Sequence, residues 1–155
     1  MTTGIETLKR LHEEVPGVVA VKDDIVGEFG RRISALFHDD WIIIGGGIKE
    51  HHLYMAPYGA QASLSAFSFF APQVTDQYWE AIKSDDWRGA ARIVEQYERP
   101  FFDFTHKLPG GFDAGIHGTL ELFGIAQRWR RPPYRSLNDQ EMEKLADLFK
   151  RLSLM

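Results

Sequence analysis

Lys22 is the residue in this sequence that is best placed for covalent chemistry. It directly follows the apolar run at residues 18–21, and a short β-branched run of this kind is typical of a buried strand in a parallel sheet. Barrels built from such strands carry their catalytic groups at the carboxyl ends. An apolar environment disfavours the ammonium form of lysine, and the neutral amine can attack a ketone to form an imine. The alternative is a lysine whose stem packs on the strand while its ammonium group reaches water.

Two acidic residues, Asp23 and Asp24, come immediately after the lysine. One interpretation is that they form an ion pair with Lys22 and control its charge state. The other is that they cap a helix that begins near Ile25, because aspartate is a favoured N-cap residue. The sequence is compatible with both.

Three consecutive glycines, Gly45, Gly46 and Gly47, follow a second apolar run at residues 41–44. Glycine lets the backbone approach a ligand closely, and the amides of such a turn can bind an anion. A tight turn from strand to helix would also select residues without a Cβ atom. The glycines are therefore candidates for ligand contact, with a purely structural turn as the alternative.

The adjacent histidines His51 and His52 do not predict a metal site. Neighbouring residues on a helix point about 100° apart, whereas two ligands on one face need an i, i+4 spacing. The chain contains no cysteine, which excludes disulfides, thiol catalysis and cysteine-ligated zinc. We therefore expect neither a metal nor another cofactor.

The bulk composition is that of an ordinary globular chain, with 155 residues, 44% of them hydrophobic and 26% charged. The net charge of −4 argues against a nucleic-acid partner. Residues 128–135 mix arginine with aromatic side chains, and we expect this stretch to be a loop packed back on the fold. No apolar run reaches membrane-spanning length and no signal core opens the sequence. We therefore expect a cytoplasmic protein without a membrane partner.

Hydrophobic periodicity predicts alternating helices and strands in the first half of the chain and helices alone in the second. The alternation predicts parallel strands joined by right-handed crossovers. The expected helices cover residues 5–14, 25–38, 49–58, 72–84, 86–105, 113–128 and 138–153, with Asn138 or Asp139 capping the last, and the expected strands cover residues 18–21, 41–44 and 62–69.

The fold class that follows is α/β, and more narrowly a partial TIM (β/α)8 barrel. An open sheet of three strands that are apolar on both faces would lack the partners that such strands need. A complete barrel has eight strands and typically ~250 residues, so the chain supplies about the last three strand and helix units. We expect residues 1–84 to form the C-terminal part of a barrel, and residues 85–155 a helical extension packed on it.

Taken together, several segments resemble the dihydrodipicolinate synthase / N-acetylneuraminate lyase family. VVAVKDD, WIIIGGG and GAQASLSAFSFFAP resemble its final strands, with Lys22 and Gly46 at the spacing that separates its lysine from a glycine turn. The later segments YWEA, DWRGAA and PPYRSL resemble its C-terminal helices and closing segment. The resemblance extends over essentially the whole chain and implies the fold of a Schiff-base lyase.

The resemblance also implies a function and a site. Lys22 would form an imine with pyruvate, or with a related 2-oxo acid or sugar acid, in an aldolase, dehydratase or synthase reaction that needs no metal. Gly46 and Gly47 would line the pocket, and Leu64 and Ser65 would border the bound oxo acid, Leu64 through its backbone.

The sequence departs from the family pattern in two ways. The family carries a threonine pair that binds the substrate carboxylate and a proton-relaying tyrosine, both upstream of the lysine. With only 21 residues before Lys22, we expect neither here, and weak or no activity from the chain alone. Ala62, the triple glycine and residues 49–52 differ from the best-known members. We therefore expect the reaction of a sugar-acid dehydratase or aldolase at least as much as a reaction of lysine biosynthesis.

The alternative from a different class is a non-catalytic half-barrel. Such a chain would assemble with itself, as a homo-oligomer, or with a separately encoded N-terminal half, because strand edges and apolar faces need a partner.

Overall fold

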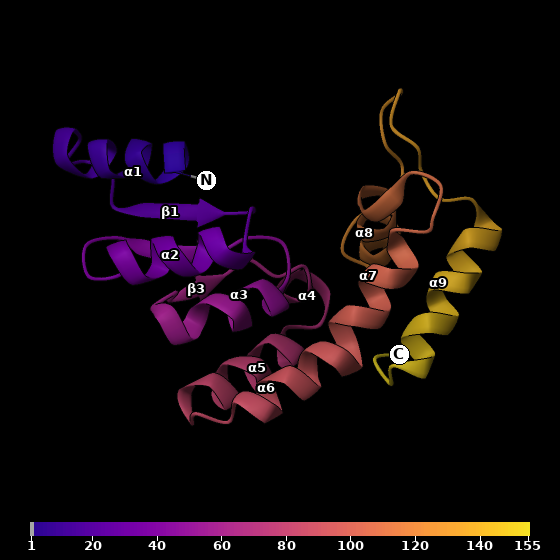
Figure 1. The fold of residues 1–155 in the computed structure, drawn as a ribbon. Helices are drawn as coiled ribbons and strands as arrows, with labels where there is room; N and C mark the ends of the chain where they lie inside the picture. The colour runs from indigo at the N-terminus through magenta and orange to yellow at the C-terminus, as the bar shows by residue number, and fades with distance from the viewer. Residues whose placement is uncertain (1) are drawn as a thin grey trace. The chain divides into compact units, whose positions relative to one another are not determined.

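The computed structural model describes residues 2–155, which divide into two compact units that meet between Ser65 and Ala66. The first unit alternates helices with strands, and Figure 1 shows them in indigo and magenta. Its elements are α1 (Thr2–Glu14), β1 (Ala20–Asp23), α2 (Gly27–Phe37), β2 (Ile42–Gly45), α3 (Lys49–Met55), the 3-10 turn η1 (Ala56–Tyr58) and β3 (Ala62–Ser63).

The second unit is helical over the residues described. Its elements are α4 (Phe67–Phe70), α5 (Pro72–Lys83), α6 (Trp87–Ile93), the π-helical turn η2 (Val94–Glu98), α7 (Arg99–Thr105), α8 (Gly111–Leu122) and α9 (Asp139–Arg151). The predicted division into alternating and helical parts is confirmed at this level. The finer assignment of residues 1–84 and 85–155 to a barrel and its extension stays a prediction.

The three strands form one parallel sheet in the order β1-β2-β3. Lys22 pairs with Ile44, and Ile44 pairs in turn with Ala62. The expected α/β class with parallel strands is therefore confirmed. The strand predicted at residues 18–21 begins later, at Ala20, and includes Lys22 instead of ending before it.

The third predicted strand, at residues 62–69, is wrong beyond Ser63. Phe67 and Phe70 lie three residues apart on the short helix α4, where both are buried. Their rings lie 5.4 and 5.6 Å from the ring of Phe101 in the same unit. A spacing of three places side chains on one face of a helix but on opposite faces of a strand, so burial of both rings favours the helix.

One face of the sheet is covered by helices. Ile43 is fully buried and packs in a core with Ile33 and Phe37 of α2 and Met55 of α3. Phe37 also stacks on Trp41, with ring centroids 4.9 Å apart. This core gives the first unit its main apolar stabilisation.

The other face of the sheet is not covered by the residues described. The side chains of Ile42 and Leu64 are 48% and 49% exposed, although both are large and apolar. The prediction that the strands are buried on both faces is therefore wrong for this chain. The two outer strands, β1 and β3, each pair only with β2 among residues 2–155. An uncovered apolar face with unpaired edges is what a part of a larger sheet presents.

Five phenylalanines form the core of the second unit. Neighbouring rings lie 4.8–5.8 Å apart in tilted and edge-to-face arrangements, which aromatic rings favour. The rings belong to Phe67, Phe70, Phe101, Phe123 and Phe149.

Two predicted helices of this unit differ in detail from the structure. The helix expected at residues 86–105 is nearly continuous but contains the π-helical turn η2, just before Pro100. Proline lacks the amide that an unbroken helix requires. The helix expected at residues 113–128 ends at Leu122, because Gly124 follows with φ 70°, a conformation that ends helices.

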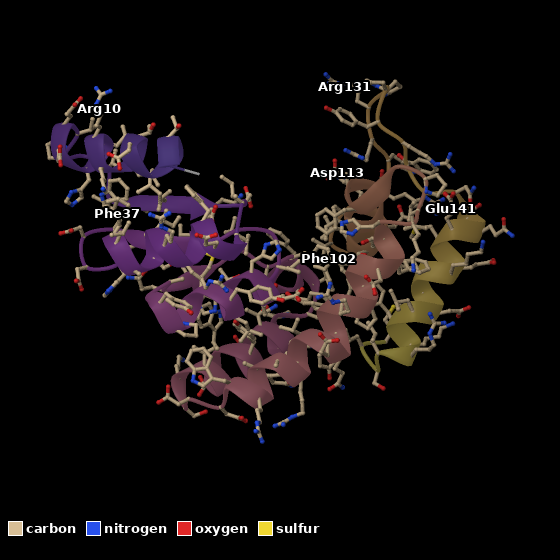
Figure 2. All side chains as sticks on the ribbon, in the orientation of Figure 1. Arg10, Phe37, Phe102, Asp113, Arg131 and Glu141 are labelled. Carbon is tan, nitrogen blue, oxygen red and sulfur yellow. The ribbon has the colours of Figure 1, made fainter. Side chains whose placement is uncertain are left out.

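The stretch at residues 128–135 is a loop, but only its base packs on the fold. The Arg128 amide donates to Glu121 at 2.8 Å, and the Arg128 guanidinium pairs with Asp139. Trp129 and Tyr134 are 64% and 62% exposed, and Figure 2 shows Arg131 at the outer end of the loop. The prediction of a loop packed back on the fold holds for the base and is wrong for the tip.

No helix formed by residues 2–155 combines the length and the apolar character needed to cross a bilayer.

The capping box of α9 yields a prediction about stability. The Asn138 side chain accepts from the Glu141 amide at 2.9 Å, and the Glu141 carboxylate accepts from the Asn138 amide at 2.9 Å. Asn138→Ala should lower the free energy of unfolding by about 1 kcal/mol, because it leaves a helix-end amide without its partner. Asn138→Asp retains an acceptor and should stay close to the unaltered chain in denaturant unfolding. Equal losses in both variants would contradict this role.

Candidate functional site

Lys22 lies one residue before the carboxyl end of β1. Side chains alternate between the faces of a strand, so Lys22 belongs to the uncovered face, whereas Val21 packs against the helix-covered core. The lysine side chain is 41% exposed, and its Nζ forms an ion pair with the Asp24 carboxylate. The amine that would do the chemistry is therefore reachable from solvent and has an acid beside it.

The two aspartates after the lysine have different roles. Asp23 is buried, and its carboxylate accepts hydrogen bonds from the amides of Ile25 at 2.9 Å and Val26 at 3.0 Å. These amides lead into α2, so Asp23 closes the loop between β1 and α2. Asp24 lies two residues beyond Lys22, on the same side of the chain, and pairs with it. The ion-pair interpretation holds for Asp24. The capping interpretation is wrong, because the N-cap of α2 is Val26, which makes no side-chain cap hydrogen bond, and Asp23 binds loop amides that precede the helix.

The loop that carries Asp24 is held in one conformation. Val26 has φ 59°, which a β-branched residue rarely adopts. Strain of this kind costs roughly 1–3 kcal/mol and persists where surrounding contacts enforce it. The bond from the Val26 amide to Asp23 and the burial of the Val26 side chain in the core are such contacts. They fix the position of Asp24 beside Lys22.

Gly46 faces the ion pair from the loop after β2. Its amide donates to the Asp23 carbonyl at 2.9 Å. A Cβ atom at position 46 would lie 1.8 Å from Asp24 Oδ1 and 3.0 Å from Lys22 Nζ, so glycine leaves room for the carboxylate in its present position. His51 Nδ1 lies 2.6 Å from the Gly46 carbonyl oxygen. Because a carbonyl oxygen only accepts, the ring nitrogen donates and holds this peptide in place.

The other two glycines serve the turn itself. Gly47 has φ 86°, a left-handed conformation that favours glycine. A Cβ atom at Gly45 would lie 3.1 Å from the backbone nitrogen of His52, so α3 packs closely against the end of β2. Of the three glycines, only Gly46 lies against the lysine, and this proximity supports the ligand-contact interpretation for that residue.

Leu64 and Ser65 follow β3 at the same edge of the sheet. The Leu64 amide donates to the Gly45 carbonyl at 3.1 Å, and the Leu64 carbonyl accepts from the Ser63 hydroxyl at 3.2 Å. The Ser65 hydroxyl lies 2.5 Å from Lys49 Nζ, which donates to it, and the Lys49 side chain is 1% exposed. The Leu64 amide is thus engaged in the sheet, and its carbonyl is the backbone group with a lone pair left for a substrate.

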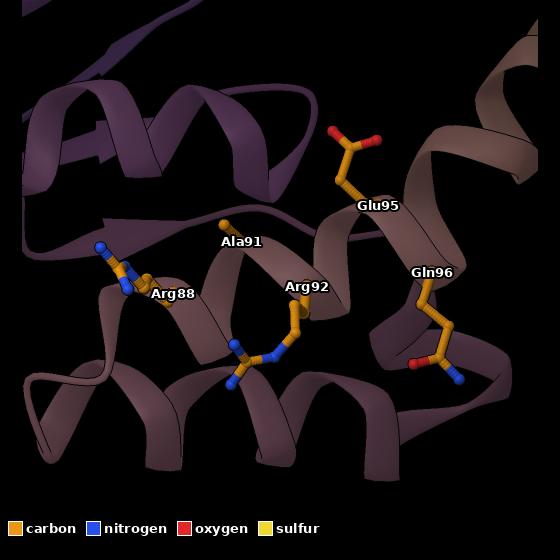
Figure 3. Close-up of a pocket in the computed structure, with 5 residues that line it drawn as sticks. All are labelled: Arg88, Ala91, Arg92, Glu95 and Gln96. Atoms are coloured by element: carbon orange, nitrogen blue, oxygen red, sulfur yellow. The ribbon is translucent and has the colours of Figure 1, made fainter.

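Each unit has a hollow that could hold a small molecule. One of about 450 Å³ is lined by Thr7 and Leu8 of α1 together with residues 21–25, a size typical of a small-molecule pocket. The other, of about 640 Å³, lies on α6 and η2, but Figure 3 shows Glu95 and Gln96 pointing away from each other. Its polar side chains do not converge on one point. The hollow at residues 21–25 reaches Lys22, but Gly46, Gly47, Leu64 and Ser65 are not among the residues that line it.

Within residues 2–155, no three histidine or acidic side chains gather closely enough to hold a metal ion.

The dihydrodipicolinate synthetase family matches residues 1–152. The chain belongs to this family. Among curated relatives, it is 32% identical to the "Probable 5-dehydro-4-deoxyglucarate dehydratase" of Allorhizobium ampelinum. The alignment of 148 residues covers 92% of the chain and 48% of the relative. The protein of the same name from Acidovorax ebreus is 26% identical over 150 residues, 95% of the chain and 50% of the relative. The chain spans about half the length of the curated relatives it matches.

Solved structures of the dihydrodipicolinate synthetase family share the fold of this chain. The dihydrodipicolinate synthase of Thermotoga maritima superposes with a TM-score of 0.79 at 18% identity, over 97% of the chain and 51% of the solved protein. The N-acetylneuraminate lyase of Proteus mirabilis superposes with a TM-score of 0.75 at 18% identity, over 97% of the chain and 50% of the solved protein. The family resemblance predicted from the sequence is thereby confirmed.

Sequence reasoning missed two features of the site. It assigned no contact to His51, although the ring donates a hydrogen bond to the Gly46 carbonyl. It also assigned no structural role to Lys49, which is buried at the start of α3 beside Ser65. No pattern in the sequence indicates that this lysine, within a polar run, is buried.

The contact between Gly46 and Asp24 yields a second prediction. Gly46→Ala should displace the Asp24 carboxylate and break its pair with Lys22, at a cost in stability of less than about 1 kcal/mol, because an exposed side chain can move aside. Loss of the pair would be visible in nuclear magnetic resonance as changed chemical shifts of the Lys22 side-chain nitrogen and the Asp24 carboxyl carbon. Gly17→Ala is the matched control, since nothing lies within 4 Å of its added Cβ atom. Unchanged chemical shifts of both groups in Gly46→Ala would contradict the contact.

His52 yields a third prediction, on pH dependence. Burial lowers the pKa of His52 from 6.5 to about 4, although the hydrogen bond to the Ala60 carbonyl opposes this shift. Because the folded-state pKa lies below the unfolded one, the unfolded chain takes up the proton first as the pH falls. The contribution of neutral His52 to the free energy of unfolding is therefore fully present above about pH 6.5. The free energy of unfolding should decline by up to about 3 kcal/mol as the pH falls toward 4.

Denaturant unfolding across this pH range measures the decline. His52→Gln should flatten this decline, whatever its effect on stability at neutral pH. The same slope in the unaltered chain and in His52→Gln would show that another group is responsible.

Proposed function

We propose that Lys22 forms an imine with a 2-oxo acid and that the chain carries the imine-forming half of a lyase. The observation that carries this proposal is the position of the lysine in a chain of the dihydrodipicolinate synthetase family. Lys22 lies at the carboxyl end of a parallel strand, on the uncovered face, beside a glycine that has no Cβ atom to block it. Barrel enzymes place their catalytic groups at this end of the strands.

The chemistry follows from the amine. Attack of neutral Nζ on the ketone carbon and loss of water give a protonated imine, which draws electrons from the neighbouring carbon. A proton on that carbon becomes acidic, and a carbon–carbon or carbon–oxygen bond one position further along can then break. Neither metal nor cofactor is needed in this scheme, because the iminium nitrogen accepts the electron pair.

The relatives favour dehydration of a sugar acid as the overall reaction. Their name, 5-dehydro-4-deoxyglucarate dehydratase, describes a six-carbon dicarboxylate with a ketone next to one carboxyl group, which makes it a 2-oxo acid. We propose that the substrate is a molecule of this class. Gly46, Gly47, Leu64 and Ser65 would border it, with the Leu64 carbonyl and the Ser65 hydroxyl as its polar contacts.

The uncovered face of the sheet supports a wider proposal about the assembled site. Ile42 and Leu64 are 48% and 49% exposed, and both outer strands have an unpaired edge within the described residues. We propose that this sheet is part of a (β/α)8 barrel whose other strands cover the face and complete the pocket. Groups that bind the substrate carboxylate and relay protons would come from those strands.

The same observation favours a second candidate function. A half-barrel without catalytic activity would use its exposed apolar face to bind a second copy of itself or a separate N-terminal half. The two candidates differ in whether Lys22 reacts with an oxo acid, which can be tested directly.

The fourth prediction is therefore a trapping experiment. The purified chain is incubated with pyruvate and reduced with borohydride, and the peptides are analysed by mass spectrometry. An adduct should appear on the peptide that contains Lys22 and be absent in Lys22→Ala. Lys83→Ala is the control for nonspecific modification, because that lysine is an exposed side chain on α5.

Absence of an adduct from a chain shown to be folded would contradict imine formation and favour the non-catalytic candidate. An adduct spread over many exposed lysines would contradict the assignment to Lys22.

A further inference from the structure

We infer that Asp24 is an acid–base group for imine formation at Lys22, in addition to the proton-relaying tyrosine that the family carries upstream of the lysine, which makes it a catalytic residue that the family resemblance does not assign. This inference rests on the proposed function, since it concerns the same amine. It follows from the contact of the Asp24 carboxylate with Lys22 Nζ, from the fixed loop that carries Asp24, and from the glycine that makes room for it.

The carboxylate is positioned by its surroundings. The bonds of Asp23 to the amides of Ile25 and Val26 hold the loop. Gly46 supplies the space, because any Cβ atom at that position would overlap Asp24 Oδ1.

No other charged group of the first unit competes with Asp24 for this role among the described residues. The Asp23 carboxylate turns away from the lysine, toward the amides before α2. The His51 ring holds the Gly46 carbonyl through Nδ1. Asp24 is therefore the acid whose carboxylate touches the reacting nitrogen.

The proton balance of imine formation suits this pair. Asp24 accepts a proton from the Lys22 ammonium, and the neutral amine attacks the ketone carbon while the carbonyl electron pair moves to oxygen. The carboxyl group then protonates that oxygen and takes a proton from the nitrogen, which gives the carbinolamine. It finally protonates the hydroxyl group, which leaves as water while the nitrogen lone pair forms the C=N bond. The ion pair of ammonium and carboxylate thus becomes one of iminium and carboxylate, with one water released and Asp24 regenerated.

Asp24→Asn tests this inference in the full chain, with pyruvate as the probe and borohydride trapping of the Lys22 adduct as the readout. The asparagine has the same shape but cannot carry the proton, so the trapping rate at neutral pH should fall by about a hundredfold. Asp24→Glu, which retains a carboxyl group, should recover much of the rate. Asp39→Asn is the matched control, because Asp39 is an exposed aspartate of the same unit with no contact to Lys22, and it should trap at the unaltered rate.

If Asp24 only holds Lys22 in its ammonium form, Asp24→Asn should trap pyruvate at an equal or higher rate, because more of the lysine would be neutral. That result would overturn the inference and leave the proposed function standing. No adduct in the unaltered chain would contradict the proposed function itself, and the inference with it.

Discussion

Parallel hydrogen bonding joins β1 to β2 from the pair Ala20–Ile42 to the pair Asp23–Gly45, and β3 continues the sheet in the same direction. Because parallel strands end at the same edge, the loops that follow them meet there. Lys22, Gly46 and Leu64 come from three separate segments, and this pairing alone brings them to one edge. A shift of one residue in the register would turn Lys22 into the helix-covered core.

The two faces of the sheet have opposite roles. The covered face holds the core of Ile33, Phe37, Ile43 and Met55, which stabilises the first unit without any group from the uncovered face. The uncovered face carries the lysine and exposed apolar side chains. This separation explains how the first unit can keep a core of its own while the proposed reaction site remains open.

Much of this arrangement could be predicted from residue patterns, because apolar runs and glycine turns are local signals. The alternation of helices and strands, the position of Lys22 near a strand end and the approach of Gly46 all follow from such signals. The sequence predicted that the strand edges and apolar faces of a partial barrel need a partner. It could not show which face lies uncovered, since an apolar run that is buried by a partner looks the same when the partner is absent. The different roles of Asp23 and Asp24 depend on which face each residue takes, and the burial of Lys49 depends on Ser65, which lies 16 residues later.

The central claim is that Lys22 reacts covalently with a 2-oxo acid. It is tested most directly by carbon-13 nuclear magnetic resonance of the chain, labelled with nitrogen-15 at its lysine side chains and mixed with pyruvate labelled at its ketone carbon. The account predicts a protein-bound carbon signal split by one-bond coupling to a lysine nitrogen and absent in Lys22→Ala. A spectrum of the folded chain with only free pyruvate and its hydrate would contradict the account.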